Sequence, residues 1–140
     1  MVHALETIHA RLKPGGILLD IHPTNEPAAI DVRLRERIIP AGWLSESDDY
    51  VEYEWADEAV AAAVDHGLFA QERCGTFKFV WHADSMRELR TYLAEEWKDA
   101  IVDDVTAMRI EELLKLPVQD KEILVSEAIR IARYRRAQRA

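Results

Sequence analysis

The fold is decided by residues 12–21, which run Leu12-Lys13-Pro14-Gly15-Gly16-Ile17-Leu18-Leu19-Asp20-Ile21. Pro14 presets the second position of a turn, and Gly15 tolerates the positive φ that a type II turn requires at its third position. The residues that follow are almost continuously apolar, which is typical of a strand covered on both faces in a parallel or mixed sheet. Such a strand needs neighbours on both edges, and little sequence precedes residue 17 to supply them.

Helical periodicity precedes this stretch, and strand-like alternation follows it. Before the turn, apolar side chains recur along one helix face, at Met1, Leu5, Ile8 and Leu12. Residues 31–38 and 51–55 each alternate apolar with charged side chains, which predicts two strands joined through a turn at residues 40–42. We expect an antiparallel hairpin with a shared charged face, formed by Arg33, Arg35 and Glu52.

Helices are predicted on both sides of a third extended segment, residues 68–81. Asp57 can cap a helix that Gly67 ends, with a buried stripe of Ala56, Val60, Ala63 and Val64. Ser85 and Glu88 fit a capping box, ahead of a helix whose apolar face comprises Met86, Leu89, Leu93 and Trp97. A further helix is expected to end near Pro117, and its inward-facing side chains are predicted to be Ile101, Val105 and Met108.

The C-terminal segment 122–136 fits both a helix and a strand. Helical spacing relates Leu124, Ala128 and Ile131, whereas strand-like alternation relates Ile123, Val125, Ile129 and Ile131. Apolar and charged residues alternate at period two from Ile129 to Arg135, and on this ground we favour the strand.

Composition indicates an acidic globular chain of 140 residues that forms a single domain, 1–140. The 18 Lys and Arg against 26 Asp and Glu argue against a nucleic-acid partner, because that affinity comes from basic residues. No apolar run approaches the ~20 residues that span a bilayer, so we expect no membrane association. A single cysteine, Cys74, excludes an internal disulfide and favours a cytoplasmic location.

The segment that runs from a helix through residues 12–16 into a buried strand resembles the L-K-P-G-G motif of Rossmann-like S-adenosylmethionine-dependent methyltransferases. In that family the motif leads into the fifth sheet strand. The resemblance implies that residues 57–66 form the next helix and that Gly67-Leu68-Phe69 leads into the sixth strand. Residues 122–135 would then form the seventh strand, which runs antiparallel between the fifth and sixth.

The chain departs from this family at the cofactor site. The family binds S-adenosylmethionine through a glycine-rich loop after its first strand and an acidic residue that ends its second. No G-x-G-x-x-G-like stretch occurs among the glycines here, which are Gly15, Gly16, Gly42, Gly67 and Gly75. The resemblance therefore implies the C-terminal half of a methyltransferase, unable alone to bind the cofactor or to methylate. The chain would be a truncated gene product, or Met1 an internal methionine of a longer reading frame.

The expected fold class is α/β: a partial Rossmann-like methyltransferase sheet of the last three strands, mixed in direction, with an added β-hairpin and flanking helices. Half of such a sheet leaves one strand edge unpaired and apolar surface uncovered, which promotes self-association. We therefore expect a homo-oligomer that forms through this edge. The alternative function is a non-catalytic module that uses the edge to bind itself or another protein.

Candidate site residues follow predicted strands. Asp20, His22 and Asn25 come at the carboxyl end of the strand that begins at Ile17, where open parallel sheets bind ligands. His22 could be a general base, with Asp20 as a weaker catalytic candidate, because imidazole exchanges a proton near neutral pH. Asn25 and His82 are candidates for substrate binding. A loop histidine bonded to backbone would explain His22 as well, and no residue pattern predicts a metal site.

Two further groups of residues have both a functional and a structural interpretation. Trp43, Trp55, Trp81 and Trp97 could line an aromatic pocket, although tryptophans at these spacings more often belong to a core or an interface. The arginines from Arg130 to Arg139 could meet an anionic partner, and we favour a solvated end of the chain.

Overall fold

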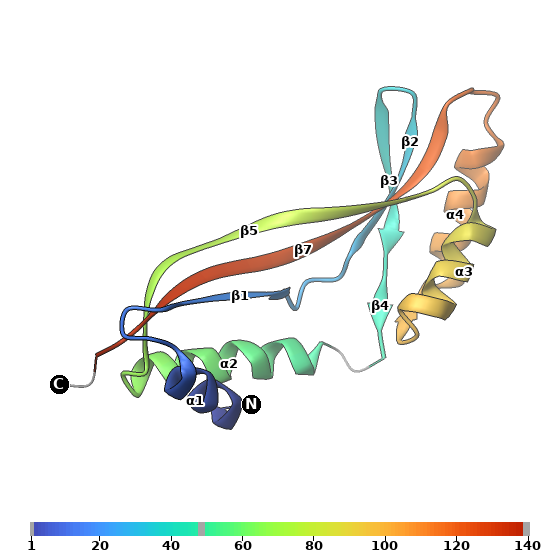
Figure 1. Cartoon of the computed structure of the whole chain (residues 1–140). Coiled ribbons are helices and arrows are strands. Elements are labelled where there is room, and N and C mark those ends of the chain that lie inside the picture. The colour runs from blue at the N-terminus through green and yellow to red at the C-terminus, as the bar shows by residue number, and fades with distance from the viewer. Residues whose placement is uncertain (1, 48–49, 139–140) are drawn as a thin grey trace. The chain divides into compact units, whose positions relative to one another are not determined.

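The computed structural model describes residues 2–47 and 50–138. Along the chain the elements are α1 (Val2–Arg11), β1 (Ile17–Pro23), β2 (Ala29–Leu34), β3 (Arg37–Trp43), β4 (Ser45–Glu46), α2 (Val51–Asp65), β5 (Phe69–Ala83), α3 (Met86–Glu96), β6 (Ala100–Ile101), α4 (Asp104–Lys115) and β7 (Lys121–Arg136) (Figure 1). The protein is therefore α/β, as expected, with a mostly antiparallel sheet.

Contacts divide the chain into two compact units. The first unit comprises Met1–Asn25, Tyr50–Phe77 and Ala128–Ala140, and the second comprises Glu26–Asp49 and Lys78–Glu127. The long strands β5 and β7 contribute residues to both units. A single domain over the whole chain stays a prediction.

In the first unit, β7 lies between β1 and β5. β1 pairs antiparallel with β7 in a register that places Ile17 opposite Arg135 and Pro23 opposite Ile129. Helices α1 and α2 lie on one side of these strands (Figure 1), and their apolar side chains share a core with both β5 and β7. The buried members of this core are Val60, Ala63, Leu68, Phe69, Ala132 and Tyr134.

β1 forms the edge of its sheet, with β7 as its pairing partner among the described residues. Its side chains Leu19 and Ile21 are 59% and 56% exposed. The prediction of a strand covered on both faces is therefore wrong within the described chain. The unpaired edge and the uncovered apolar side chains expected for half of a sheet are both present.

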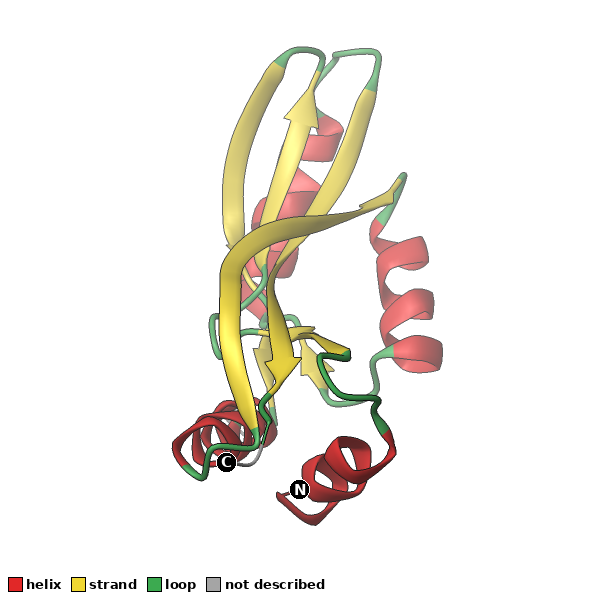
Figure 2. Ribbon diagram, turned by 60° about the vertical axis from the view of Figure 1, so that its left-hand side comes forward, coloured by secondary structure: helices red, strands yellow, loops and turns green. Residues whose placement is uncertain are grey.

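In the second unit, β2 pairs antiparallel with β3 on one edge and with the first half of β7 on the other. The helices α3 and α4 pack against these strands (Figure 2). Their common core includes Ile30, Val32, Leu89, Ile110 and Ile123, all of which are fully buried. The short strands β4 and β6 form a separate pair.

Several local predictions are confirmed. The amide of Gly16 donates to the carbonyl of Lys13 at 2.8 Å, and Gly15 has a φ of 71° at the third position of this turn. Gly67 ends α2 with a φ of 70°. The amide of Glu88 donates to the Ser85 hydroxyl at the start of α3, as in a capping box. Residues 69–83 and 121–136 are strands.

The predicted hairpin between residues 31–38 and 51–55 is wrong. β2 instead pairs with β3 across a turn at Arg35 and Glu36, and residues 51–55 begin α2, so Glu52 lies on a different element. Acidic side chains in this first turn favour a helix N-terminus, and the alanine-rich run that follows has high helix propensity. The predicted turn at residues 40–42 lies inside β3, where the register shifts at a bulge.

Two helix predictions need correction. Asp57 lies inside α2, which begins at Val51, and therefore does not cap it. In α4 the predicted inward residues Val105 and Met108 are 78% and 62% exposed, and Ile101 lies in β6. Asp103 caps α4, and the buried positions of this helix are Thr106, Ala107, Ile110 and Leu113. The predicted helix residue Met1 lies outside the described residues.

None of the described helices combines the length and hydropathy that a membrane crossing requires.

Candidate functional site

His22 and Asp20 come together at the end of β1, as their spacing of two along a strand predicts. The Nδ1 of His22 lies 3.2 Å from a carboxylate oxygen of Asp20. The Nε2 of His22 lies 3.0 Å from Oδ1 of Asp57, which α2 supplies. The imidazole is therefore held between two carboxylates of the first unit.

Arg130 completes this group from β7. It is the direct cross-strand partner of His22 in the register of β1 and β7. One of its terminal nitrogens donates to Asp20 at 3.2 Å, and its Nε lies 3.5 Å from Asp57. We call Asp20, His22, Asp57 and Arg130 the His22 cluster.

The guanidinium of Arg130 is anchored from the buried side of the unit. Its second terminal nitrogen donates to the Tyr134 hydroxyl at 3.0 Å, and that hydroxyl donates to Gln71 at 3.2 Å. Tyr134 is 1% exposed. Partial burial lowers the pKa of Arg130, but the bond to Tyr134 and the charge of Asp57 outweigh it and raise the pKa above its ordinary value. Arg130 thus remains a fixed positive charge.

Solvent reaches the His22 cluster mainly at Asp57. The side chains of His22, Asp20 and Arg130 are 12%, 21% and 20% exposed, whereas Asp57 is 50% exposed. Asp57 is therefore the partner that an incoming polar group can replace with the least rearrangement.

This arrangement suits reversible proton transfer. Both carboxylates accept hydrogen bonds, so the two contacts form together when each ring nitrogen carries a hydrogen. Where another polar group takes the place of Asp57, an imidazole that donates from Nδ1 to Asp20 can accept a hydrogen bond at Nε2. After Nε2 takes up a proton, both nitrogens donate, one to Asp20 and the other to Asp57 or to the group that replaces it. The charge of Arg130 balances one of the two carboxylates, so the protonated cluster is electrically neutral.

Asn25 lies near this site in the chain but has a different partner. Its side-chain amide donates to Glu54 of α2 at 3.2 Å. Glu54 precedes Asp57 by about one helical turn, so both carboxylates belong to the same face of α2. The bond fastens the chain segment after β1 to the helix that carries Asp57.

His82 belongs to the second unit and to a separate ionic group. Its Nδ1 lies 3.2 Å from Glu122, which also accepts a bond of 2.7 Å from Arg33. Arg33 additionally forms an ion pair with Asp120 at 3.0 Å. The bonds from Arg33 lower the pKa of both carboxyl groups. His82 therefore connects β5 to the start of β7, and Arg33 connects β2 to the same segment. The binding role of His82 stays a prediction.

Sequence reasoning missed two members of the His22 cluster. We expected Asp57 to be a helix cap and Arg130 to belong to a solvated chain end. The register of β1 with β7 places Arg130 opposite His22, and no pattern in either segment alone specifies this register. Among the described residues no group of three or more His, Cys, Asp or Glu side chains has an arrangement that could hold a metal ion.

Comparison with models of known protein families, with curated proteins and with solved structures found no match to this chain.

Proposed function

We propose that the chain forms the acceptor-binding C-terminal part of an S-adenosylmethionine-dependent methyltransferase and cannot bind the cofactor by itself. The order β1–β7–β5, with β7 antiparallel to β1, carries this proposal. It is the order that the resemblance implies for the fifth, seventh and sixth strands of the family. A helix precedes β1 and another precedes β5, and both lie on the same side of the strands.

The glycines of this chain do not fit a cofactor loop. Such a loop joins the carboxyl end of a strand to a helix N-terminus, where backbone amides approach the ligand. Gly15 and Gly16 precede β1, Gly67 ends α2, and Gly42 and Gly75 lie within strands. On this proposal the cofactor-binding residues belong to sequence outside these 140 residues.

The proposed role of the His22 cluster is to bind and deprotonate a hydroxyl or amine acceptor. The acceptor replaces Asp57 at Nε2 of His22 and passes its proton to that nitrogen. Asp20 orients the ring, and Arg130 offsets the carboxylate charge beside it. No step in this scheme depends on a residue outside the first unit.

Reading the gene upstream of the Met1 codon tests the proposal. We expect an in-frame segment that encodes a strand, a glycine-rich loop and a helix. The longer protein should bind S-adenosylmethionine by calorimetry, whereas the 140-residue chain should release no heat. In the longer protein, His22→Gln should lower the rate of methyl transfer about 100-fold or more.

His66→Gln is the matched control, because it makes the same substitution at an exposed histidine of the first unit outside the His22 cluster and should alter the rate much less. Micromolar binding of S-adenosylmethionine to the 140-residue chain would contradict the proposal. So would the absence of any upstream segment of this kind.

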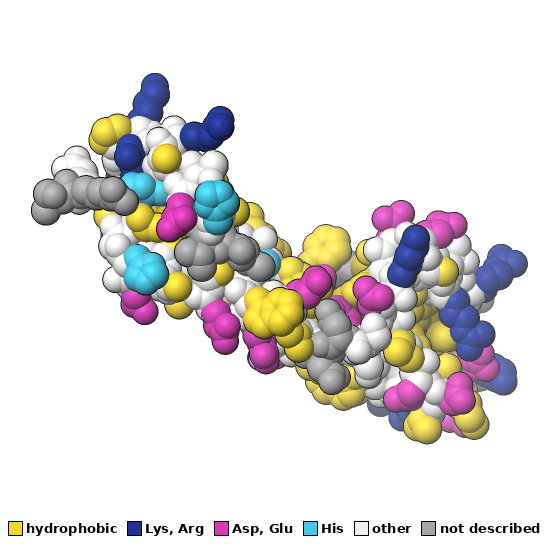
Figure 3. All heavy atoms as spheres, turned by 90° about the horizontal axis from the view of Figure 1, so that it is seen from below, with side chains coloured by type: hydrophobic (Ala, Val, Ile, Leu, Met, Phe, Trp, Pro, Cys, Tyr) yellow, Lys and Arg dark blue, Asp and Glu magenta, His cyan; other side chains and the backbone are white. Residues whose placement is uncertain are grey.

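A second candidate function is a non-catalytic module that self-associates through β1. The exposed apolar side chains Leu19, Ile21 and Ile131, together with the free edge of β1, favour it. Residues Ile21 and Ile131 are cross-strand partners, so they form one continuous apolar surface. Figure 3 shows that hydrophobic side chains also reach the surface elsewhere, among charged ones.

Sedimentation equilibrium at micromolar concentration tests the module. We expect a dimer or larger species that Leu19→Lys converts to a monomer, because a buried ammonium at the interface lacks a partner. Val105→Lys is the control, since Val105 is exposed on α4 of the second unit. A monomeric wild-type chain would exclude the module.

A further inference from the structure

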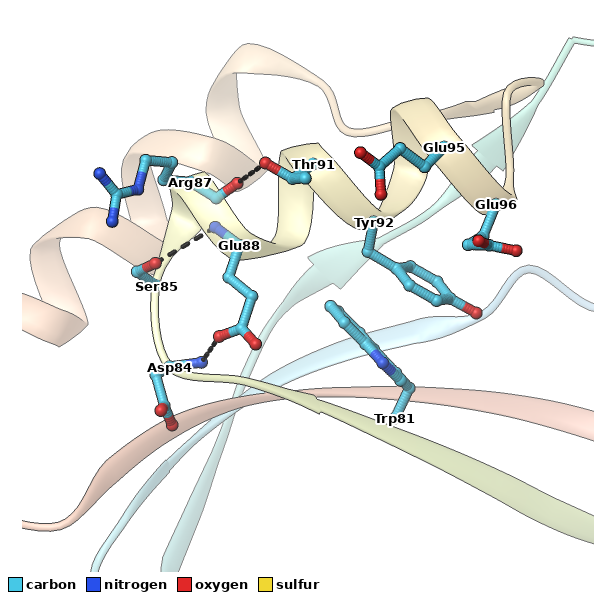
Figure 4. Close-up of a pocket in the computed structure, with 9 residues that line it drawn as sticks. All are labelled: Trp81, Asp84, Ser85, Arg87, Glu88, Thr91, Tyr92, Glu95 and Glu96. Carbon is cyan, nitrogen blue, oxygen red and sulfur yellow. Dashed lines mark hydrogen bonds between the residues drawn. The ribbon is translucent and has the colours of Figure 1, made fainter.

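The second unit contains an open cavity of about 820 Å³ beside α3 (Figure 4). Its lining comes from the end of β5, the connection to α3 and one side of that helix. A space of this size can hold a small organic molecule. Neither the His22 cluster nor β1 takes part in it.

Two stacked aromatic rings form the apolar part of the cavity. The ring centroids of Trp81 and Tyr92 are 4.0 Å apart, and the ring planes are inclined by only 20°. Figure 4 shows the indole rising from β5 toward the phenol that hangs from α3. Both side chains are half-buried and line the cavity, so part of each ring remains exposed there. The stack fixes both rings before any ligand arrives, which lowers the entropy lost on binding.

The polar part of the lining is strongly acidic. The lining contains one cation, Arg87, and four carboxylates, so its charges sum to about −3. The carboxylates are those of Asp84, Glu88, Glu95 and Glu96. Glu88 is already occupied, because its carboxylate accepts from the amide of Asp84 at 2.7 Å. Glu95 and Glu96 have no ion-pair partner among the described residues, and both are exposed. Their charge is therefore available to a ligand.

We propose that this cavity binds an organic cation of the ammonium class, with the cationic group against Trp81 and Tyr92. The faces of aromatic rings carry negative potential and attract a cation directly. Glu95 and Glu96 supply the opposite charge from the same helix that carries Tyr92. An anion would be repelled, and a neutral molecule of the same shape would gain only dispersion contacts. The inference does not depend on the proposed transferase function.

Titration of the isotope-labelled full chain with choline chloride, followed by NMR, tests this site. The indole N–H resonance of Trp81 and the amide resonances of α3 should shift together with one dissociation constant. The neutral carbon isostere of choline, 3,3-dimethylbutan-1-ol, should bind about fivefold more weakly or worse, because it lacks the charge. Raising the salt concentration should weaken the binding of choline and leave the binding of the neutral isostere unchanged.

Two pairs of variants locate the ligand. The double variant Glu95→Gln with Glu96→Gln should weaken choline binding at least about threefold, whereas Glu112→Gln on α4 should leave it unchanged. Trp81→Leu should abolish binding, and Trp43→Leu should preserve it. The glutamine variants alter exposed side chains only and keep the test decisive if Trp81→Leu does not fold.

Three outcomes would overturn the proposal. The first is equal affinity for choline and its neutral isostere. The second is undiminished binding by the double glutamine variant. The third is the absence of any shift in β5 and α3 at millimolar choline.

Discussion

Two glutamates of β7, Glu122 and Glu127, have pKa values displaced in opposite directions. The hydrogen bond from Arg33 lowers the pKa of Glu122 below its ordinary 4.5. Burial raises the pKa of Glu127 above 4.5, and the nearby charge of Glu46 adds to the effect. Glu46 is itself 7% exposed and accepts a bond from the indole of Trp97.

The two shifts predict opposite dependences of stability on pH. A lowered pKa in the folded state stabilises the fold above pH 4.5, and this contribution is lost as the pH falls through the folded-state value. A raised pKa has the reverse effect: the folded state gains stability at low pH, and loses it as the pH rises from 4.5 through the folded-state value.

We therefore expect Glu127→Gln to raise the melting temperature at pH 7 and to change it little below about pH 4. Glu122→Gln should lower the melting temperature at pH 7, with a difference from wild type that also shrinks in acid. Thermal denaturation at several pH values measures both. Two variants that shift the melting temperature in the same direction at pH 7 would contradict the assignment.

At the scale of elements, a single glycine sets how closely β3 approaches α4. A Cβ at Gly42 would lie 2.2 Å from the Oγ1 of Thr106, far inside contact distance. Thr106 is 5% exposed and belongs to the buried face of α4. The helix therefore packs directly on the backbone of the strand.

Gly42→Ala should lower the free energy of unfolding by about 1–3 kcal/mol, because the added methyl group overpacks this contact. Gly75→Ala is the matched control, since a Cβ there meets no atom within 4 Å. It should be neutral or slightly stabilising, because alanine restricts the unfolded chain. Urea denaturation measures both, and equal stabilities of the two variants would refute the packing argument.

Elements whose cause is local could be predicted from the sequence. The turn at Pro14 and Gly15, the end of α2 at Gly67 and the start of α3 at Ser85 each depend on residues only a few positions apart. The face of α4 could not be predicted, because the close contact with Gly42 decides which of its side chains are buried. The partner of β2 could not be predicted either. Residues 51–55 alternate like a strand but form the start of α2, which leaves β3 to pair with β2.

The candidate site also contains residues that the sequence predicts and residues that only the tertiary structure brings in. Asp20 and His22 were predicted because both follow one apolar strand. Asp57 and Arg130 come from α2 and β7, and the register of β1 with β7 brings Arg130 to His22 across more than a hundred residues. A periodicity rule sees each segment alone and cannot supply that register.

At the scale of the whole molecule, net charge opposes self-association. The chain carries a charge of −8 at pH 7 and has an isoelectric point near 5.1. Repulsion between copies therefore weakens as the pH falls toward 5, while the apolar side chains of β1 remain exposed.

We expect the apparent mass from light scattering to increase between pH 7.5 and pH 5.5, and to do so at lower protein concentration in high salt. Leu19→Lys should suppress the increase, because it adds a positive charge to the apolar surface while leaving the net charge still negative. A mass that is constant over this pH range would show that charge does not limit association.

The strand β7 passes from one compact unit to the other without interruption. Side chains alternate between the two faces of a strand. The number of residues between the two halves of β7 therefore determines which side chains turn inward in each half. Adding one residue between Glu127 and Ala128 would send Arg130 and Tyr134 to the wrong side while leaving Ile123 and Val125 in place. A one-residue insertion or deletion in this strand should therefore be tolerated only where a β-bulge absorbs it, as in β3.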